Sequence, residues 1–273
     1  MNLTQQTDKT ATASKIALKQ VQHHFTAGGR LLQVLDSVDF YADEGEFVSV
    51  IGPSGCGKST LLNIIAGLEA PSQGTVCLDG VEVAQRLGQV GYMHQKDLLL
   101  SWRTVLDNAI LGLEVQGVPR SEARAQAAEL MERFGLRGFE KEFPFALSGG
   151  MRQRAAFLRT VLTQNDVMLL DEPFGALDAL TRTQMQEWLL DLWASFHKTI
   201  VLVTHDVDEA LFLSDRIYML TARPGRVKLE MKVDMPRPRS YEIVTREPFT
   251  ALKATLLTAI REESPHLQEN PWH

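Results

Sequence analysis

A glycine-rich turn between an apolar strand and a helix constrains the fold of this chain more than any other feature. Residues 52–60 read G-P-S-G-C-G-K-S-T and match the pattern G-x-x-x-x-G-K-[ST]. The β-rich apolar run Phe47–Ile51 precedes the turn, and Thr60–Leu68 has helical character. A chance match in a glycine-rich turn is the alternative, and the flanking strand and helix argue against it. The segment therefore predicts a phosphate-binding loop in an α/β fold.

The residue types in this loop suit nucleotide phosphates and Mg²⁺. Glycines allow backbone N–H groups to turn inward around an anion, and the following helix adds the positive end of its dipole. Lys58 supplies a point charge to the β- and γ-phosphates, and the Ser59 hydroxyl is placed to coordinate Mg²⁺. We interpret Cys56 as a small residue that fits the loop rather than a redox group. The residues predicted to bind the nucleotide here are Gly52, Pro53, Ser54, Gly55, Cys56, Gly57, Lys58, Ser59 and Thr60.

Two further apolar strands are predicted to end in polar groups. Val167–Leu170 runs into Asp171 and Glu172, and Thr199–Thr204 ends at His205. Short apolar runs separated by helical segments predict a parallel, helix-covered sheet, in which ligands gather at the carboxyl ends of the strands. Asp171 would then join the Mg²⁺ shell, and Glu172 would be the general base toward the attacking water. A solvated acidic turn is the alternative, and the phosphate loop upstream disfavours it.

Helical patterns dominate the rest of the chain. Ser121–Phe134 is rich in Ala, Glu and Arg and is followed by Gly135 as a stop signal. Met185–Phe196 predicts a second amphipathic helix, and Val227–Val233 predicts an edge strand. The first of these helices could belong to a helical subdomain between the first two strands.

Composition narrows the class of protein. With 273 residues and 44% hydrophobic content the chain can bury the core of one large α/β domain. A net charge of -6 argues against general nucleic-acid binding, and two cysteines do not suggest a disulfide framework. Residues 1–14 are polar, so we expect a disordered tail rather than a signal peptide. The apolar runs are too short to span a bilayer, which predicts a cytosolic chain by default.

A second anion site is predicted at Leu147–Arg154, which reads L-S-G-G-M-R-Q-R. Ser148, Gly149 and Gly150 stand at the start of an apolar-periodic helix, whose N-terminal amides attract anions. An ordinary N-capping serine is the alternative. Two phosphate-type sites for one nucleotide are explained if the second site faces the ATP of a partner chain, so that a dimer encloses two ATP molecules.

Together these motifs resemble those of the ATP-binding subunits of ABC transporters, in the order and spacing of that family, from about residue 16 to residue 233. The glycine loop resembles the Walker A motif, L-S-G-G-M the family signature, and Val167–Glu172 the Walker B motif. The resemblance implies ATP and Mg²⁺ as cofactors, and Ser59, Gln95 and Asp171 as the residues near the metal.

Four more positions take their roles from this resemblance. Gln95 matches the Q-loop glutamine, which contacts Mg²⁺ and senses the membrane partner, and Asp178 in G-A-L-D matches the D-loop. His205 matches the switch histidine at the γ-phosphate, so it is predicted to be catalytic together with Glu172. Phe25 matches an aromatic residue that stacks on adenine, with core packing as its alternative.

The resemblance also implies the architecture. We expect an α/β P-loop NTPase core with a mostly parallel sheet and an N-terminal antiparallel β portion. The ABC ATPase domain would span residues 15–240 and include a helical subdomain at about residues 96–160. Residues 241–273 would form a short helical appendage.

Three features resemble the importer subgroup that handles nitrate, sulfonates, taurine and thiamine precursors. Met151 and Gly175 depart from the commonest residues of the signature and the D-loop, and Leu98–Asn108 reads L-L-L-S-W-R-T-V-L-D-N. The segment around Trp102 would lie near the groove for the membrane subunit, with a buried aromatic as the alternative.

The function predicted from these features is ATP hydrolysis that drives a membrane importer for a small polar solute. The chain would form a homodimer through an ATP sandwich, bind separate transmembrane permease subunits and depend indirectly on an extracytoplasmic solute-binding protein. It would be peripheral, at the cytoplasmic face of the inner membrane. The alternatives are a soluble ABC-type ATPase of nucleic-acid maintenance or translation and a P-loop kinase of a small metabolite. The kinase would leave Ser148, Asp178 and His205 unexplained.

Overall fold

The computed structural model describes residues 14–263, so the tail predicted at residues 1–14 lies outside the described residues except for Ser14, where the first strand begins. The strands are β1 (Ser14–Ala27), β2 (Arg30–Asp43), β3 (Phe47–Ile51), β4 (Gln73–Leu78), β5 (Val81–Glu82), β6 (Gly91–Met93), β7 (Val167–Asp171), β8 (Thr199–Val203), β9 (Arg216–Leu220) and β10 (Val227–Lys232). The α-helices are α1 (Lys58–Ala66), α2 (Val105–Ala109), α3 (Leu111–Val115), α4 (Arg120–Met131), α5 (Gly149–Leu162), α6 (Ala179–Phe196), α7 (Val207–Leu213) and α8 (Glu247–Glu262). The short 3₁₀ helices are η1 (Pro144–Ala146) and η2 (Tyr241–Thr245).

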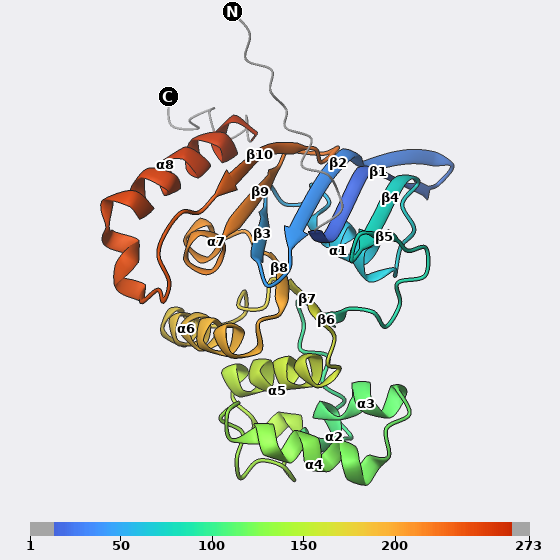
Figure 1. Cartoon of the computed structure of the whole chain (residues 1–273), viewed down its shortest axis with the longest axis vertical. Coiled ribbons are helices and arrows are strands. Elements are labelled where there is room, and N and C mark those ends of the chain that lie inside the picture. Colours follow the sequence, from blue (N-terminus) through green and yellow to red (C-terminus); the bar gives the residue numbers. More distant parts are fainter. Residues whose placement is uncertain (1–13, 264–273) are drawn as a thin grey trace, which may run out of the picture.

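A six-stranded sheet occupies the centre of the molecule (Figure 1). Its strand order is β10-β9-β3-β8-β7-β6, in which β9 through β6 run parallel and the edge strand β10 is antiparallel. Every residue of β3, β7 and β8 is buried, because helices cover both faces of the parallel strands. The predicted parallel sheet is confirmed, and so is the edge strand. Since β8 lies between β3 and β7, the carboxyl ends of all three meet at one edge.

A second, antiparallel sheet has the order β2-β1-β4-β5 and confirms the N-terminal β portion. Its apolar face shares a hydrophobic core with α1 and with one face of the central sheet; Phe40, Val50 and Leu61 belong to that core. The helix that follows the phosphate loop is therefore held between two sheets, which fixes the carboxyl end of the loop.

The chain between β6 and β7 forms a helical group, α2 to α5, at the lower end of Figure 1. Small residues on α4 allow close helix packing, since Ala123 and Ala127 are fully buried. The helix predicted over 121–134 ends at Met131, because the Leu136 N–H bonds to the Met131 carbonyl across Gly135, which has a φ of 62°. The subdomain limits predicted from the sequence stay a prediction.

α6 is longer than the helix predicted from residue 185. It begins at Ala179, because the Asp178 carboxylate caps the N–H of Thr181 at 3.0 Å. The first six residues of α6 have no buried side chain, so the hydrophobic pattern detects the helix only from Met185 onward.

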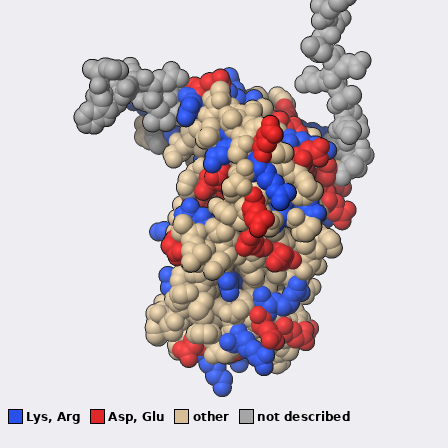
Figure 2. Space-filling view, turned by 90° about the vertical axis from the view of Figure 1, so that its left-hand side faces the viewer, with Lys and Arg blue, Asp and Glu red and all other residues tan. Residues whose placement is uncertain are grey.

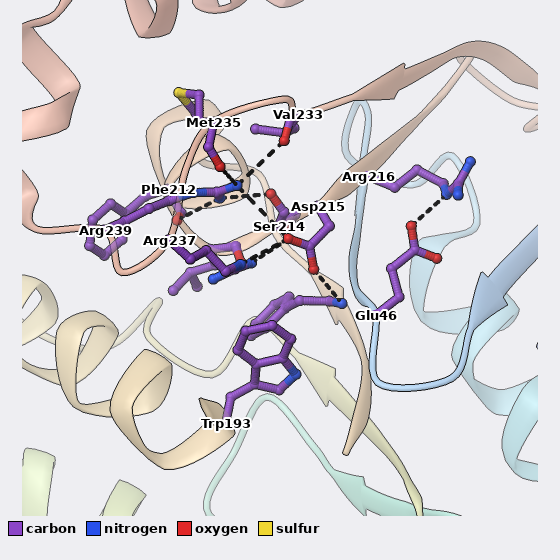
Figure 3. A network of polar contacts seen from close by, with 12 residues as sticks. Glu46, Trp193, Phe212, Ser214, Asp215, Arg216, Val233, Met235, Arg237 and Arg239 are labelled. Atoms are coloured by element: carbon purple, nitrogen blue, oxygen red, sulfur yellow. Dashed lines mark hydrogen bonds and ion pairs between the residues drawn. The ribbon is translucent and has the colours of Figure 1, made fainter. Parts of the chain in front are cut away.

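The segment between β10 and the C-terminal helices is attached to the core by one buried arginine (Figure 3). The Arg239 guanidinium donates to five backbone carbonyls. They belong to Leu211, Phe212, Ser214, Val233 and Met235. Beyond this point Phe249 and Leu256 bury α8 against the core. Across residues 14–263, the helices are all too short or too polar to cross a membrane.

Candidate active site

The phosphate loop joins β3 to α1 at the carboxyl edge of the central sheet. Gly52, Gly55 and Gly57 have φ angles of 153°, 75° and 108°, a region that favours glycine. A Cβ on Gly57 would lie 2.7 Å from the Leu35 Cδ2 atom, so packing also excludes a side chain there. The loop can therefore wrap around a ligand only with glycine at this position.

Lys58 places a cation at the centre of the loop. Its side chain is buried, and Nζ donates to the carbonyls of Gly52 at 2.8 Å and Pro53 at 3.0 Å. A glycine backbone around one buried ammonium group fits a phosphate-bearing ligand. The Cys56 thiol is buried and burial raises its pKa, which suits a small packing residue and disfavours a reactive thiol.

Ser59 and Asp171 bring hard oxygen donors to the same edge. The Ser59 hydroxyl donates to Asp171 Oδ1 at 3.2 Å, so α1 and β7 present these groups side by side. Burial raises the pKa of Asp171, and the Ser59 hydrogen bond opposes that rise. A hydroxyl and a carboxylate are oxygen donors of the kind that suits Mg²⁺.

Glu172 is the meeting point of the other predicted residues. Its Oε2 accepts from Gln95 Nε2 at 3.0 Å and lies 3.3 Å from His205 Nδ1. Glu172 has a φ of 44°, which costs a non-glycine residue roughly 1 kcal/mol. Its backbone N–H bonds to the Val203 carbonyl at 2.8 Å, which holds the strained residue beside β8. Residues after β6, β7 and β8 thus converge on one carboxylate.

Comparison with known protein families finds a match to the family described as ABC transporter, over residues 35–175. That match covers the phosphate loop, Gln95, Ser148 and Glu172. The chain belongs to the ABC transporter family.

Curated relatives of this ABC chain have names that state import. The formylaminopyrimidine import ATP-binding protein of Halalkalibacterium halodurans is 44% identical, over 85% of this chain and 91% of its own length. The taurine import ATP-binding protein of Rhizobium johnstonii is 48% identical, over 77% and 80%. An aliphatic sulfonates import ATP-binding protein of Bacillus cereus is 40% identical, over 89% and 94%.

Solved structures agree with the fold. A dimeric ATP-binding cassette in a post-hydrolysis state bound to ADP and Pi has a TM-score of 0.70 at 32% identity, and covers 81% of this chain and all of that one. Part of the cbiONQ transporter complex from Clostridium perfringens has a TM-score of 0.73 at 23% identity, over 94% of this chain, and shows the fold alone.

The signature and D-loop of this ABC chain serve local roles within one protomer. Ser148 caps α5 by accepting from the Met151 N–H at 3.3 Å, and Asp178 caps α6. In Figure 1, α5 lies among the lower helices, whereas α1 and the loop lie in the upper part. The structure therefore brings Gln95, Glu172 and His205 together, whereas α5, which the predicted signature serine caps, belongs to a different group of helices from α1.

Two predicted aromatic positions are exposed. Phe25 on β1 is 39% exposed and meets His23 edge-on, with ring centroids 4.6 Å apart, so the core-packing alternative is wrong. Trp102 is 74% exposed, which also excludes the buried-aromatic alternative for the segment before α2.

Two residues at the site have no counterpart in the sequence predictions. Glu209 on α7 lines the same pocket as His205, and the helical spacing that puts it on one face with Phe212 could have shown that it is buried. Arg223, in the turn R-P-G-R, touches the phosphate loop, a contact for which the sequence has no local signal.

Proposed function

We propose that this chain is the ATP-hydrolysing, energy-coupling subunit of a membrane importer for a small polar solute. The solute would be a sulfonate, an oxyanion or a thiamine-precursor pyrimidine. The names of the relatives state import of aliphatic sulfonates, taurine and formylaminopyrimidine. The observation that carries this proposal is the convergence of Gln95 and His205 on Glu172, next to the Ser59–Asp171 pair and the phosphate loop.

The roles of these residues follow from their chemistry. Lys58 and the amides of residues 52–60 would bind the β- and γ-phosphates, and Phe25 would stack on adenine. Ser59, Gln95 and Asp171 would hold Mg²⁺, which when bound neutralises phosphate charge.

Glu172 would accept the proton of the attacking water as general base. His205 would contact the γ-phosphate and, through its 3.3 Å approach to Glu172, orient that carboxylate toward the water.

Two protomers would enclose two ATP molecules, each between the loop of one chain and Ser148, Gly149 and Gly150 of the other, with Asp178 at the same interface. This arrangement would give the signature at the start of α5 a role at the ATP of the other chain. Closure would move permease subunits docked near Gln95–Asn108, where Trp102 is exposed. The chain would be peripheral at the cytoplasmic face of the inner membrane and would depend indirectly on an extracytoplasmic solute-binding protein.

The rival functions have less support. Membership of the ABC family argues against a small-metabolite kinase. Figure 2 shows basic and acidic side chains interspersed on the face that carries α6 and α8, rather than the uniformly basic surface of a protein that coats nucleic acid. We therefore propose no nucleic-acid partner.

The test is Glu172→Gln, which keeps the size and the hydrogen-bonding capacity of the side chain but removes the base. We expect ATP hydrolysis to fall by at least about 100-fold while MgATP binding is retained. The variant should accumulate as an ATP-bound dimer, measured by light scattering after gel filtration with and without MgATP.

The control is Glu129→Gln, the same substitution at an exposed position of α4. It should hydrolyse ATP like the wild type and should not accumulate as a dimer. Hydrolysis by Glu172→Gln at the wild-type rate would remove Glu172 from the catalytic role.

A further inference from the structure

The turn between β9 and β10 contacts the phosphate loop through the side chain of Arg223. Arg223 is exposed, and its Nε and Nη2 both donate to the Gly55 carbonyl, at 3.0 and 2.8 Å. Two N–H donors of one guanidinium group on one carbonyl fix the position of that oxygen more firmly than a single neutral hydrogen bond. None of the roles proposed above for ATP, Mg²⁺ or water uses this contact.

The same turn approaches the loop closely at a second point. A Cβ added to Gly225 would lie 2.2 Å from the Cys56 carbonyl oxygen, so only glycine allows this approach. Gly225 is itself held by β2, because its N–H bonds to the Val34 carbonyl at 2.8 Å and its carbonyl accepts from the Asp36 N–H at 3.0 Å. The turn is thus attached to β2 while it packs on the loop.

Further contacts fix the backbone on both sides of Arg223. The Thr221 hydroxyl donates to the Pro224 carbonyl at 3.0 Å and accepts from the Arg226 backbone N–H at 3.0 Å. Glu263, at the end of α8, accepts from the Ala222 N–H at 2.9 Å. The guanidinium of Arg223 therefore extends from an anchored backbone.

This contact sets the direction of a peptide group in the loop. In a trans peptide the carbonyl and the next N–H point in opposite directions. The Gly55 carbonyl points toward Arg223, so the Cys56 N–H of the same peptide group points the opposite way, into the loop. There it meets the Pro53 carbonyl at 3.3 Å. A loop rich in glycine samples many other conformations, so holding it in the binding conformation lowers the cost of ligand binding.

We propose that Arg223 is a positioning residue that holds the phosphate loop in its ATP-binding conformation from the β9–β10 turn. This inference rests on the proposed function, since it takes ATP as the ligand of the loop.

The test is Arg223→Met in the full chain, which removes the donors and keeps an unbranched side chain. We expect the Kd for MgATP, from isothermal titration, and the KM to rise about tenfold. The kcat at saturating MgATP should stay within about twofold of the wild type, because Arg223 touches no reacting group. Arg223→Lys, which can donate to Gly55 without the fork of the guanidinium, should recover part of the affinity.

Arg226→Met is the matched control, since it removes a cation and an ion pair from the same turn without touching the loop. It should bind MgATP with wild-type affinity. Equal affinity losses in Arg226→Met and Arg223→Met would assign the effect to general charge attraction and overturn the proposal. A wild-type Kd for Arg223→Met would also overturn it, with or without a fall in Tm. A wild-type chain that binds no MgATP would instead refute the proposed function itself, and this inference with it.

Discussion

Glu209 is a buried carboxyl group that lines one pocket together with Glu172 and His205. Its Oε2 accepts from Gln186 Nε2 at 3.1 Å, while its Oε1 has no hydrogen-bond partner. Burial, assisted by the nearby charge of Asp206, raises the pKa of Glu209 from 4.5 to about 7, and the hydrogen bond from Gln186 and the charge of Arg182 oppose the rise. The folded chain therefore holds this proton at pH values where the unfolded chain has released it.

The sign of the resulting pH dependence follows from proton linkage. Between pH 4.5 and about 7 the folded state binds more protons at Glu209 than the unfolded state, so the free energy of unfolding falls as the pH rises through this window. The loss totals roughly 3 kcal/mol. Glu209→Gln, neutral at every pH, should lose less stability than the wild type between about pH 5 and pH 8 in denaturant unfolding. Equal losses in the two proteins would contradict this prediction, and Glu129→Gln provides the exposed control.

Residues of the site differ in how far the sequence could predict them. Lys58 and Ser59 belong to one contiguous motif whose local geometry determines their place, and Glu172 and His205 directly follow buried strands of one parallel sheet. Arg223 acts through a contact 168 residues away in the chain, which no local periodicity encodes.

Among the structural elements, the link from β10 to α8 depends most on one side chain. Arg239 is fully buried, and burial lowers the pKa of its guanidinium to about 10, with the charge of Arg237 acting in the same direction. Its Nη1 group donates hydrogen bonds to carbonyls at the end of α7, where the helix dipole favours a cation.

Arg239→Met should therefore destabilise the chain, because it leaves buried carbonyls without donors. We expect a loss of roughly 3 kcal/mol and a Tm lower by about 6–12 °C, measured by thermal and denaturant unfolding. The neighbouring Arg237→Met should cost less, about 1 kcal/mol, because Arg237 is partly exposed to solvent at its ion pair with Asp215. A loss from Arg239→Met no larger than that of Arg237→Met would show that this link is not held by the buried arginine.

Element boundaries were predictable where apolar periodicity reaches the end of the element. β3, β7 and β8 are buried throughout, and their predicted limits agree with the structure to within one residue. The start of α6 was predicted six residues late, because Asp178 begins the helix by capping and the first turns face away from the core. Tertiary contacts, such as those of Arg239, determine where the C-terminal elements pack.

At the scale of the whole molecule, the proposed ATP sandwich gives the signature at the start of α5 its role. Ser148 caps α5, which lies among the lower helices of Figure 1, whereas α1, which begins at Lys58, lies in the upper part. A dimeric cassette at 32% identity with ADP and Pi shares this fold. The proposed sandwich therefore makes hydrolysis, but not binding, depend on the partner.

Ser148→Arg tests this dependence, because a long charged side chain at the start of α5 would block the ATP held by the other protomer. We expect hydrolysis to fall about 100-fold while the monomer binds MgATP with its wild-type Kd. In the Glu172→Gln background the added Arg should also prevent the ATP-dependent dimer.

Ser121→Arg, at the exposed start of α4, is the matched control and should leave hydrolysis intact. Since Ser148→Arg also removes a helix cap worth about 1 kcal/mol, Tm is measured in parallel. Loss of MgATP binding by a folded monomer would contradict the sandwich, because the signature would then act on the ATP of its own chain.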